Sequence, residues 1–241
     1  VLVREVGFGA SSFEFRNPVS ALGDLNRDGA SDFALLRGYE ANTADEASVL
    51  VYFGGADRVP SSNDFPTAPL RAADADIRIR RFDVDALPNE TSITGGSINA
   101  GLSFSSLSIT SGDFDNDRRL DIAIGQASSQ VLQVDGSGTL VPVDLIDRGS
   151  VHVVWNPALI GGDIVLDRAP ADLNGDERID VLHIDGAFSG DGFGSLARTR
   201  QIDSDLDGYD DLFIGASRAD ALRADVVDQA GAIYAIYGTP R

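Results

Sequence analysis

The chain has 241 residues, of which 43% are hydrophobic and 24% charged, a balance typical of a folded globular protein rather than a disordered one. Its formal net charge of -19 disfavours binding to nucleic acid and to anionic membrane surfaces. The absence of cysteine excludes disulfides, thiolate metal sites and a cysteine nucleophile.

Short β-strands are predicted along the whole chain, because Val, Ile, Tyr and Phe alternate with other residues in runs bounded by Gly, Pro and Asp. In chain order these strands lie at 1–7, 19–22, 32–38, 48–55, 77–84, 107–110, 121–126, 149–155, 163–167, 180–185, 196–202, 211–217 and 231–238. Helical periodicity is scarce, and its best candidate is 219–229. Connections rich in Pro and Gly, such as 58–70, separate the strands. The sequence therefore predicts an all-β fold.

Four acidic segments share the pattern Asp-x-[Asp/Asn]-x-Asp-x-x-x-Asp and begin at Asp24, Asp113, Asp172 and Asp203. The copies at Asp24, Asp113 and Asp203 lie 89 and 90 residues apart, and each runs directly into an apolar strand. The Asp172 copy breaks this rhythm, since it begins 31 residues before the next. A period of this kind indicates a repeat architecture. We therefore predict a single domain, 1–241, with approximate repeats at 1–90, 91–185 and 186–241.

Each acidic loop is interpreted as a metal site with side-chain oxygens at positions 1, 3, 5 and 9 and a backbone carbonyl at position 7. Such an all-oxygen set suits Ca²⁺ better than softer metals, whereas Mg²⁺ prefers fewer protein ligands and more water. The candidate ligands of the three in-phase loops are Asp24, Asn26, Asp28, Ala30, Asp32, Asp113, Asp115, Asp117, Arg119, Asp121, Asp203, Asp205, Asp207, Tyr209 and Asp211. Those of the fourth loop are Asp172, Asn174, Asp176, Arg178 and Asp180.

About three Ca²⁺ sites are predicted, and the fourth loop, at 172–180, is left open. Gly29 and Gly208 provide the positive φ that a tight turn favours at position 6, but Arg118 and Glu177 stand there in the other two loops. An EF-hand is rejected because it requires a glutamate at position 12 and flanking helices. Position 12 is instead occupied by Leu35, Ile124, His183 and Ile214, each within a predicted strand.

These residues resemble the FG-GAP repeats of integrin α-subunit propellers and their bacterial relatives. The third repeat carries the resemblance best, with GFGSLA at 192–197, DSDLDGYDDLFIGAS at 203–217 and GAIYAIYG at 231–238. The resemblance implies Ca²⁺-binding loops that support the blades of a β-propeller rather than perform chemistry. These repeats are longer and fewer than is usual for the family.

We therefore expect a β-propeller-like array of about three four-stranded antiparallel blades with long connections between strands. The array is either a partial propeller or an unusually small one. The third repeat lacks an outer strand, and the N-terminal strand at 1–7 is a candidate to complete it. This predicts that deletion of the first seven residues destabilises the last repeat.

The sequence favours a non-enzymatic function. No nucleophile elbow, phosphate loop or zinc motif is present, and the two histidines, His152 and His183, are interpreted as ordinary strand residues. The favoured function is a calcium-stabilised extracellular module for interaction, adhesion or assembly, which binds a protein partner or other subunits of a surface assembly. The alternative is a propeller that binds or hydrolyses polysaccharide. In either case the connections at 56–76 and 127–148 are expected to form the recognition surface.

An extracellular or cell-surface location is expected. No apolar run approaches the ~20 residues of a membrane-spanning helix, so no membrane insertion is predicted. The sequence contains no methionine, even at position 1, which indicates a processed or truncated chain, as after removal of a signal peptide.

Overall fold

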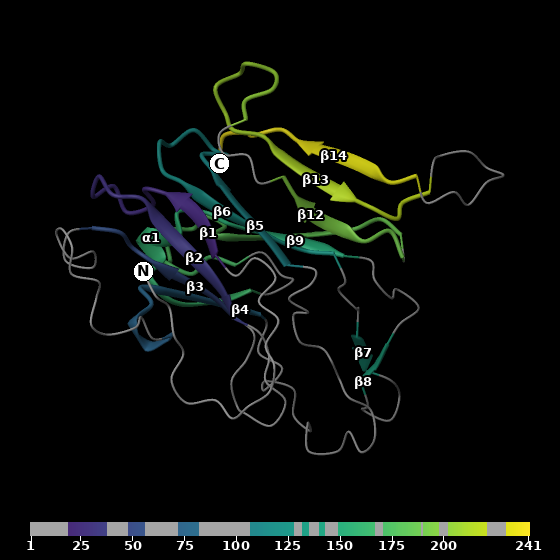
Figure 1. Cartoon of the computed structure of the whole chain (residues 1–241), viewed down its shortest axis with the longest axis horizontal. Helices are drawn as coiled ribbons and strands as arrows, with labels where there is room; N and C mark the ends of the chain where they lie inside the picture. The colour runs from purple at the N-terminus through teal and green to yellow at the C-terminus, as the bar shows by residue number, and fades with distance from the viewer. Residues whose placement is uncertain are drawn as a thin grey trace.

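The computed structural model describes residues 19–37, 48–55, 72–81, 107–127, 132–134, 140–142, 149–166, 171–188, 190–197, 202–220 and 230–241 (Figure 1). The strand predicted at 1–7 lies outside these residues, as do most of the connection at 58–70 and all but two residues of the helix predicted at 219–229. In the described part, no helix is both long and apolar enough to cross a membrane.

The described chain is all-β, as predicted: its regular structure is strand apart from two short helical turns, and it forms three larger sheets and one hairpin. The first sheet has the order β1 (Val19–Gly23), β2 (Asp32–Arg37), β3 (Ser48–Tyr52), β4 (Ile77–Arg81) and β10 (Gly162–Leu166). The second has the order β11 (Val181–Asp185), β9 (Ser150–Val154), β6 (Asp121–Gln126) and β5 (Leu107–Gly112). The third has the order β12 (Phe193–Leu196), β13 (Leu212–Ala216) and β14 (Ala232–Ile236). The hairpin pairs β7 (Leu132–Val134) with β8 (Leu140–Pro142), and the helical turns are η1 (Ala72–Asp74) and α1 (Pro157–Ile160).

Antiparallel pairing connects the strands of each sheet, with one exception. β1 to β4 pair in chain order, and the second sheet pairs β5, β6, β9 and β11 in the same way. The exception is β10, which pairs in parallel with β4 and so adds a fifth strand to the first sheet. The local sequence of 162–166 indicates a strand but not this distant partner. None of the three sheets closes on itself.

The strand predicted at 196–202 was placed too late in the chain. β12 instead spans Phe193–Leu196, and its register against β13 pairs Phe193 with Ala216 and Leu196 with Ile214. The apolar Phe193 and Leu196 are buried there, whereas the charged residues that follow have no equivalent apolar pattern. Burial of these two side chains therefore sets the position of the strand.

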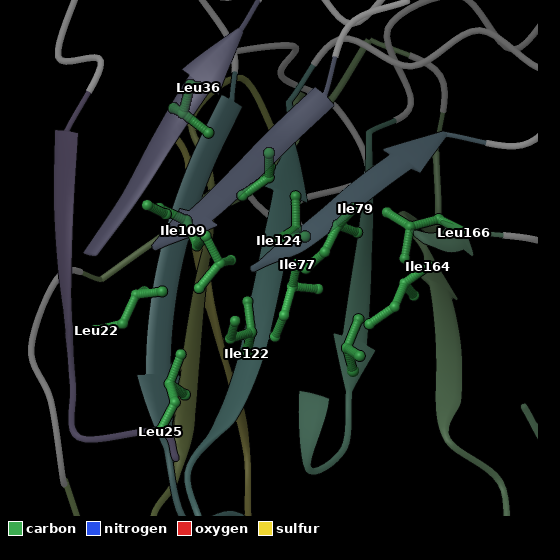
Figure 2. Packing of buried hydrophobic residues seen from close by; sticks show 14 of the residues in the cluster. Leu22, Leu25, Leu36, Ile77, Ile79, Ile109, Ile122, Ile124, Ile164 and Leu166 are labelled. Atoms are coloured by element: carbon green, nitrogen blue, oxygen red, sulfur yellow. The ribbon is translucent and has the colours of Figure 1, made fainter. Parts of the chain in front are cut away.

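Two apolar cores lie between the sheets, one on each face of the second sheet. The residues of the first core come from facing strands of the first and second sheets and are shown in Figure 2. Among them, Ile77, Ile122 and Ile164 are completely buried. Alternate residues of the second sheet, such as Ala123 and Val153, face the other way and pack against the third sheet. Full burial of an isoleucine side chain contributes about 1.5–3 kcal/mol, so the two cores hold the three sheets together.

Hydrogen bonds and close backbone contacts join the sheets at positions about one repeat apart. The Ser111 hydroxyl donates to the Leu22 carbonyl (2.6 Å), and the Ser108 hydroxyl donates to the Gly194 carbonyl (2.8 Å). At Gly125 the backbone of the third sheet approaches so closely that an added Cβ would lie 1.9 Å from the Gly194 oxygen. In Figure 1 the second sheet accordingly lies between the other two, so the sheets are stacked in the order of the repeats.

Candidate metal-binding loops

All four acidic loops have the same internal hydrogen-bond pattern, which begins with the aspartate at position 1. This carboxylate accepts a hydrogen bond from the backbone N–H of position 6. The four pairs are Asp24 with Gly29 (2.9 Å), Asp113 with Arg118 (2.8 Å), Asp172 with Glu177 (2.9 Å) and Asp203 with Gly208 (2.9 Å). The contact folds the chain back on itself within five residues, so each loop is organised locally by its own sequence.

The aspartate at position 5 continues the pattern by accepting from the N–H of position 7. These pairs are Asp28 with Ala30 (2.8 Å), Asp117 with Arg119 (2.7 Å), Asp176 with Arg178 (3.0 Å) and Asp207 with Tyr209 (3.0 Å). The side chain at position 3 accepts from the N–H of position 5 in every loop: Asn26 (3.0 Å), Asp115 (3.2 Å), Asn174 (2.9 Å) and Asp205 (3.2 Å). The side chains at positions 1, 3 and 5 therefore all turn inward, toward the backbone of their own loop.

The aspartate at position 9 closes each loop and connects it to the sheet. In the three in-phase loops, one oxygen accepts from position 2 of the loop and the other from the N–H just after a neighbouring strand. Position 2 is Leu25 for Asp32 (2.7 Å), Phe114 for Asp121 (3.0 Å) and Ser204 for Asp211 (2.7 Å). The strand-end donors are Gly54 (2.7 Å), Asn156 (2.9 Å) and Gly238 (3.2 Å).

Sequence reasoning missed these strand-end donors, although two of them carry a local signal. An added Cβ at Gly54 would lie 2.4 Å from the Ser31 oxygen, and one at Gly238 would lie 2.7 Å from the Asp210 oxygen. Both contacts involve the residue at position 8 of the loop, so glycine is needed for the strand end to pass over it. Asn156 occupies this place in the second repeat with a positive φ of 47°.

Positions 4 and 6 of every loop have a positive φ. The sequence predicted this for position 6, where Arg118 (φ 70°) and Glu177 (φ 67°) have the left-handed conformation that glycine has in the other two loops. Position 4 was not predicted, and three of its four residues are not glycine: Arg27 (φ 64°), Asn116 (φ 55°) and Leu206 (φ 64°). Such conformations cost about 1–2 kcal/mol for most side chains, so these loops contain backbone strain.

Replacement of Arg118 by glycine is expected to stabilise the protein by about 1 kcal/mol, because glycine adopts a positive φ without steric cost. The Arg118→Gly variant is compared with Arg119→Gly, which places the same residue one position later, where φ is not positive. Urea unfolding should show a higher midpoint for the first variant and a lower midpoint for the second. Equal shifts in both variants would contradict the strain at Arg118.

Two of the loops bring three carboxylates together. In each of the groups Asp113, Asp115, Asp117 and Asp203, Asp205, Asp211, oxygens of the three side chains lie within 4.8 Å of one another. The loops at Asp24 and Asp172 form no such group among the described residues, in part because each has an asparagine at position 3.

The Asp113 loop satisfies a direct test of whether these residues fit a cation. Its Asp113 Oδ1 is buried and has no hydrogen-bond partner. The same is true of the Oδ1 of Asn156, whose side-chain amide donates to Asp117 (2.8 Å). Buried oxygens normally have a partner, and carboxylate and amide oxygens are the ligands that hard divalent cations favour. The donor set could therefore hold a hard divalent cation, and the carboxylate groups at 113–117 and 203–211 fit one best.

Three carboxyl groups of the Asp113 loop, those of Asp113, Asp115 and Asp121, have raised pKa values. Burial and, to a lesser extent, the charges of Asp115 and Asp117 raise the pKa of Asp121 to about 8, against the hydrogen bonds from the backbone N–H groups of Asn156 and Phe114. Burial also raises the pKa of Asp113 and of Asp115, and their acidic neighbours add to both shifts. In the third repeat burial likewise acts to raise the pKa of Asp211, but hydrogen bonds from Ser204 and Gly238 outweigh it and lower the pKa.

The metal-free protein is expected to lose stability as the pH rises from about 5 to about 8. The pKa of Asp121 in the folded state, about 8, exceeds its ordinary value of 3.8, so the folded chain retains a proton that the unfolded chain releases. This one group lowers the free energy of unfolding by up to about 1.4 kcal/mol per pH unit in that window. Thermal melts in a chelator measure the slope, which Ca²⁺ should flatten and Asp121→Asn should reduce. A melting temperature that rises over this window would contradict the shift.

The three in-phase loops lie against one another. The Arg27 guanidinium of the first loop donates to the carbonyls of Asp117 and Arg118 in the second. Between the second and third loops, the Asp113 N–H donates to the Asp210 carboxylate (2.7 Å) and the Asp210 N–H donates to the Asp113 carbonyl (3.0 Å). Through these contacts the three loops form one continuous row of acidic residues across the stacked sheets.

The two histidines lie side by side in adjacent strands of the second sheet. His152 in β9 pairs with His183 in β11, and His183 Nδ1 lies 2.8 Å from His152 Nε2. His183 Nε2 lies 3.1 Å from an oxygen of Asp185, two residues along the same strand. The two histidines are 31 residues apart in the sequence, and no local pattern indicated that the sheet register brings them together.

Comparison with protein-family models finds no match for the chain, and no curated protein matches it at a significant level.

Proposed function

We propose that the chain is a calcium-stabilised, extracellular, non-enzymatic module for adhesion or assembly, built as a small or partial β-propeller of FG-GAP type. The observation that carries the proposal is the repetition of one loop geometry at the starts of β2, β6 and β13, in sheets stacked in repeat order. A repeated cation loop at equivalent strand ends is what a scaffold requires. Repetition of one structural unit is typical of repeat scaffolds.

The residues best suited to hold Ca²⁺ are those of the two carboxylate groups, at 113–117 and 203–211. Ca²⁺ bound there would supply the positive charge that offsets the repulsion among these carboxylates. The chain itself supplies the geometry, because backbone N–H groups already orient each side chain. The Asp24 loop shares this hydrogen-bond pattern and is proposed as a third, weaker site.

The propeller assignment rests on how the sheets meet. Propeller blades are antiparallel sheets that pack face to face around an axis, with the first strand of each blade nearest that axis. Here the first strands contact their neighbours directly: β1 contacts β5 through Leu22 and Ser111, and β5 contacts β12 through Ser108 and Gly194. The third sheet has three strands among the described residues, and residues 1–7 are proposed as its fourth.

The recognition surface is assigned to the long connections at 56–76 and 127–148, which lie largely outside the described residues. The acidic loops are assigned to the scaffold, since most of their carboxylate oxygens accept hydrogen bonds from their own loop or sheet. Loops held on a rigid β-scaffold commonly carry binding functions.

The function is tested by immobilising the chain and measuring adhesion of cells or isolated cell surfaces in Ca²⁺ and in EGTA. Adhesion that requires Ca²⁺ and is removed by protease treatment of the surface supports a protein partner. A parallel assay incubates the chain with a panel of polysaccharides and measures both binding and release of reducing ends. Polysaccharide cleavage, or adhesion abolished by glycosidases rather than protease, would contradict the proposal and favour a polysaccharide-directed propeller.

A further inference from the structure

The Asp172 loop differs from the other three loops at position 9. In the in-phase loops, the carboxylate at position 9 accepts an N–H from the end of a neighbouring strand. Asp180 immediately precedes β11, which is the outermost strand of the second sheet, so no described strand lies on its outer side. One Asp180 oxygen accepts the N–H of position 2, Leu173 (2.8 Å), as in the other loops, and also the N–H of Asn174 (3.1 Å). The other oxygen accepts the Asn174 side-chain amide (3.3 Å), where the in-phase loops have a strand-end N–H.

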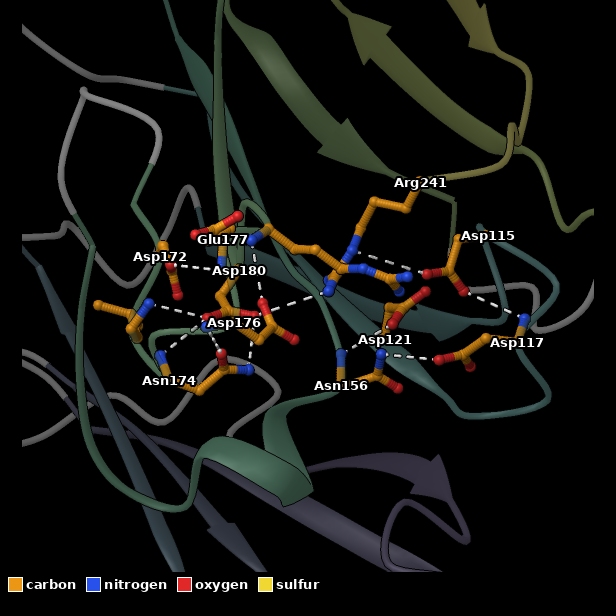
Figure 3. Close-up of polar contacts among 12 residues, drawn as sticks. Asp115, Asp117, Asp121, Asn156, Asp172, Asn174, Asp176, Glu177, Asp180 and Arg241 are labelled. Carbon is orange, nitrogen blue, oxygen red and sulfur yellow. Dashed lines mark hydrogen bonds and ion pairs between the residues drawn. The ribbon is translucent and has the colours of Figure 1, made fainter.

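A guanidinium lies within ion-pair distance of Asp180. Arg241 Nη2 lies 3.8 Å from Asp180 Oδ1, and the Asp180 side chain is 1% exposed. Figure 3 shows the Arg241 side chain lying between Asp115 on one side and Asp180 on the other. A carboxylate buried to this extent is stable as a charge only when a cation or strong donors accompany it.

The same guanidinium also reaches the Asp113 loop. Arg241 Nε lies 4.0 Å from Asp115 Oδ2, and the guanidinium carbon lies 5.9 Å from the centre of the Trp155 ring. β6 and β11 each run antiparallel to β9, so these two strands point in the same direction. The loops that precede them therefore lie at the same end of the sheet. A single cation therefore lies between an out-of-phase acidic loop and an in-phase one.

The guanidinium of Arg241 forms ion pairs with carboxylates but no bidentate hydrogen bond to either of them. Its side chain is 14% exposed, yet Nε and Nη1 are buried and have no hydrogen-bond partner. Both carboxylate distances exceed the length of a hydrogen bond, so charge and the face of Trp155 hold the group in place. A metal ion at Asp115 would remove one of its two negative partners.

We propose that Arg241 is the built-in cation of the Asp172 loop, where it takes the place of Ca²⁺, and that it competes with Ca²⁺ for Asp115 of the neighbouring loop. The inference rests on the proposed calcium function. It assigns the four loops two different roles: the in-phase loops bind metal, and the Asp172 loop is closed internally. Asn174, which directs its amide N–H groups rather than its oxygen toward Asp180, belongs to the same internally closed arrangement.

The test counts bound Ca²⁺ per chain by equilibrium dialysis with elemental analysis, in the full chain and in Arg241→Gln. The variant is expected to bind one more Ca²⁺ than the unchanged protein. The additional ion should be lost again in the double variant Arg241→Gln/Asp180→Asn. Loss of a positive charge about 4 Å from Asp115 should also raise the Ca²⁺ affinity of the Asp113 loop at least about fivefold.

Two controls separate this effect from loss of folding or of charge in general. Arg241→Lys keeps the charge and should retain the original stoichiometry. Arg27→Gln removes a guanidinium that contacts carbonyls of the Asp113 loop, not its carboxylates, and should also leave the stoichiometry unchanged. Urea unfolding in a chelator verifies that each variant is folded before Ca²⁺ is counted.

The outcomes distinguish the two levels of the proposal. If the unchanged protein binds Ca²⁺ and the Arg241→Gln variant binds it with the same stoichiometry and affinity, the inference about Arg241 is overturned, whereas the proposed calcium function stands. The inference is also overturned if the single variant Asp180→Asn binds one Ca²⁺ fewer than the unchanged protein, because the Asp172 loop of the unchanged protein would then already hold a metal ion. If neither protein bound Ca²⁺, the proposed calcium function itself would fail.

Discussion

The Gly125→Ala variant should be less stable than the unchanged protein by about 3 kcal/mol, because the added methyl group has no room between the second and third sheets. Its Cβ would lie 1.9 Å from the Gly194 oxygen and 2.8 Å from the Ser108 hydroxyl oxygen. Gly194 cannot retreat freely, since its carbonyl accepts the hydrogen bond from Ser108 (2.8 Å). For a chain of this size, the loss corresponds to a melting temperature lower by roughly 6–12 °C.

The third repeat offers a matched control at the equivalent position. Gly215 lies 90 residues after Gly125, in the same place of its strand, and a Cβ there would meet Ser195 at 3.4 Å, an ordinary contact distance. Gly215→Ala should leave stability unchanged or raise it slightly, since alanine is less flexible than glycine in the unfolded chain. Trp155 is the single tryptophan and packs with the core of the second and third sheets, so its fluorescence reports unfolding there. Equal melting temperatures for the two variants would contradict the close approach at Gly125.

Calcium should raise the melting temperature by an amount that exceeds the effect of any single substitution. Each site saturated at a hundred times its dissociation constant adds about 2.7 kcal/mol to the free energy of unfolding. Two sites, one for each carboxylate group, would together raise the melting temperature by roughly 10–20 °C. The measurement is a thermal melt in EGTA and in Ca²⁺, and Mg²⁺ at the same concentration should give a smaller shift because it prefers fewer protein ligands.

The Asp113→Asn variant identifies which residues cause this stabilisation. The variant keeps the size of the side chain and the oxygen that accepts the Arg118 N–H. It replaces the other oxygen, Oδ1, which has no hydrogen-bond partner and is the proposed metal ligand, with an amide nitrogen. About half of the Ca²⁺-induced shift should be lost. Asp163→Asn, in the exposed part of β10, changes the net charge equally and should retain the whole shift. A protein shown by elemental analysis to be Ca²⁺-free that melts at the same temperature with and without Ca²⁺ would exclude the metal sites.

The sequence by itself determined the β-strands and the internal form of the acidic loops. Alternating apolar residues predicted all the larger strands, with β12 the one that was misplaced, because burial on one face of a sheet imposes a period of two. The loop contacts are equally local: Asp24 accepts from Gly29, five residues away, and Asp32 from Leu25, seven residues away. Interactions of such short range are encoded in a few consecutive residues, so a repeated pattern is sufficient to reveal them.

Only the tertiary structure decided what lies between the loops and between the sheets. The parallel pairing of β10 with β4 and the contact of Gly125 with Gly194 join segments that are distant in the chain and have no common sequence pattern. The position of Arg241 between Asp115 and Asp180 likewise depends on β6 and β11 running in the same direction in one sheet. These contacts follow from how stacked sheets bury their apolar faces, which is a property of the whole chain rather than of any one segment.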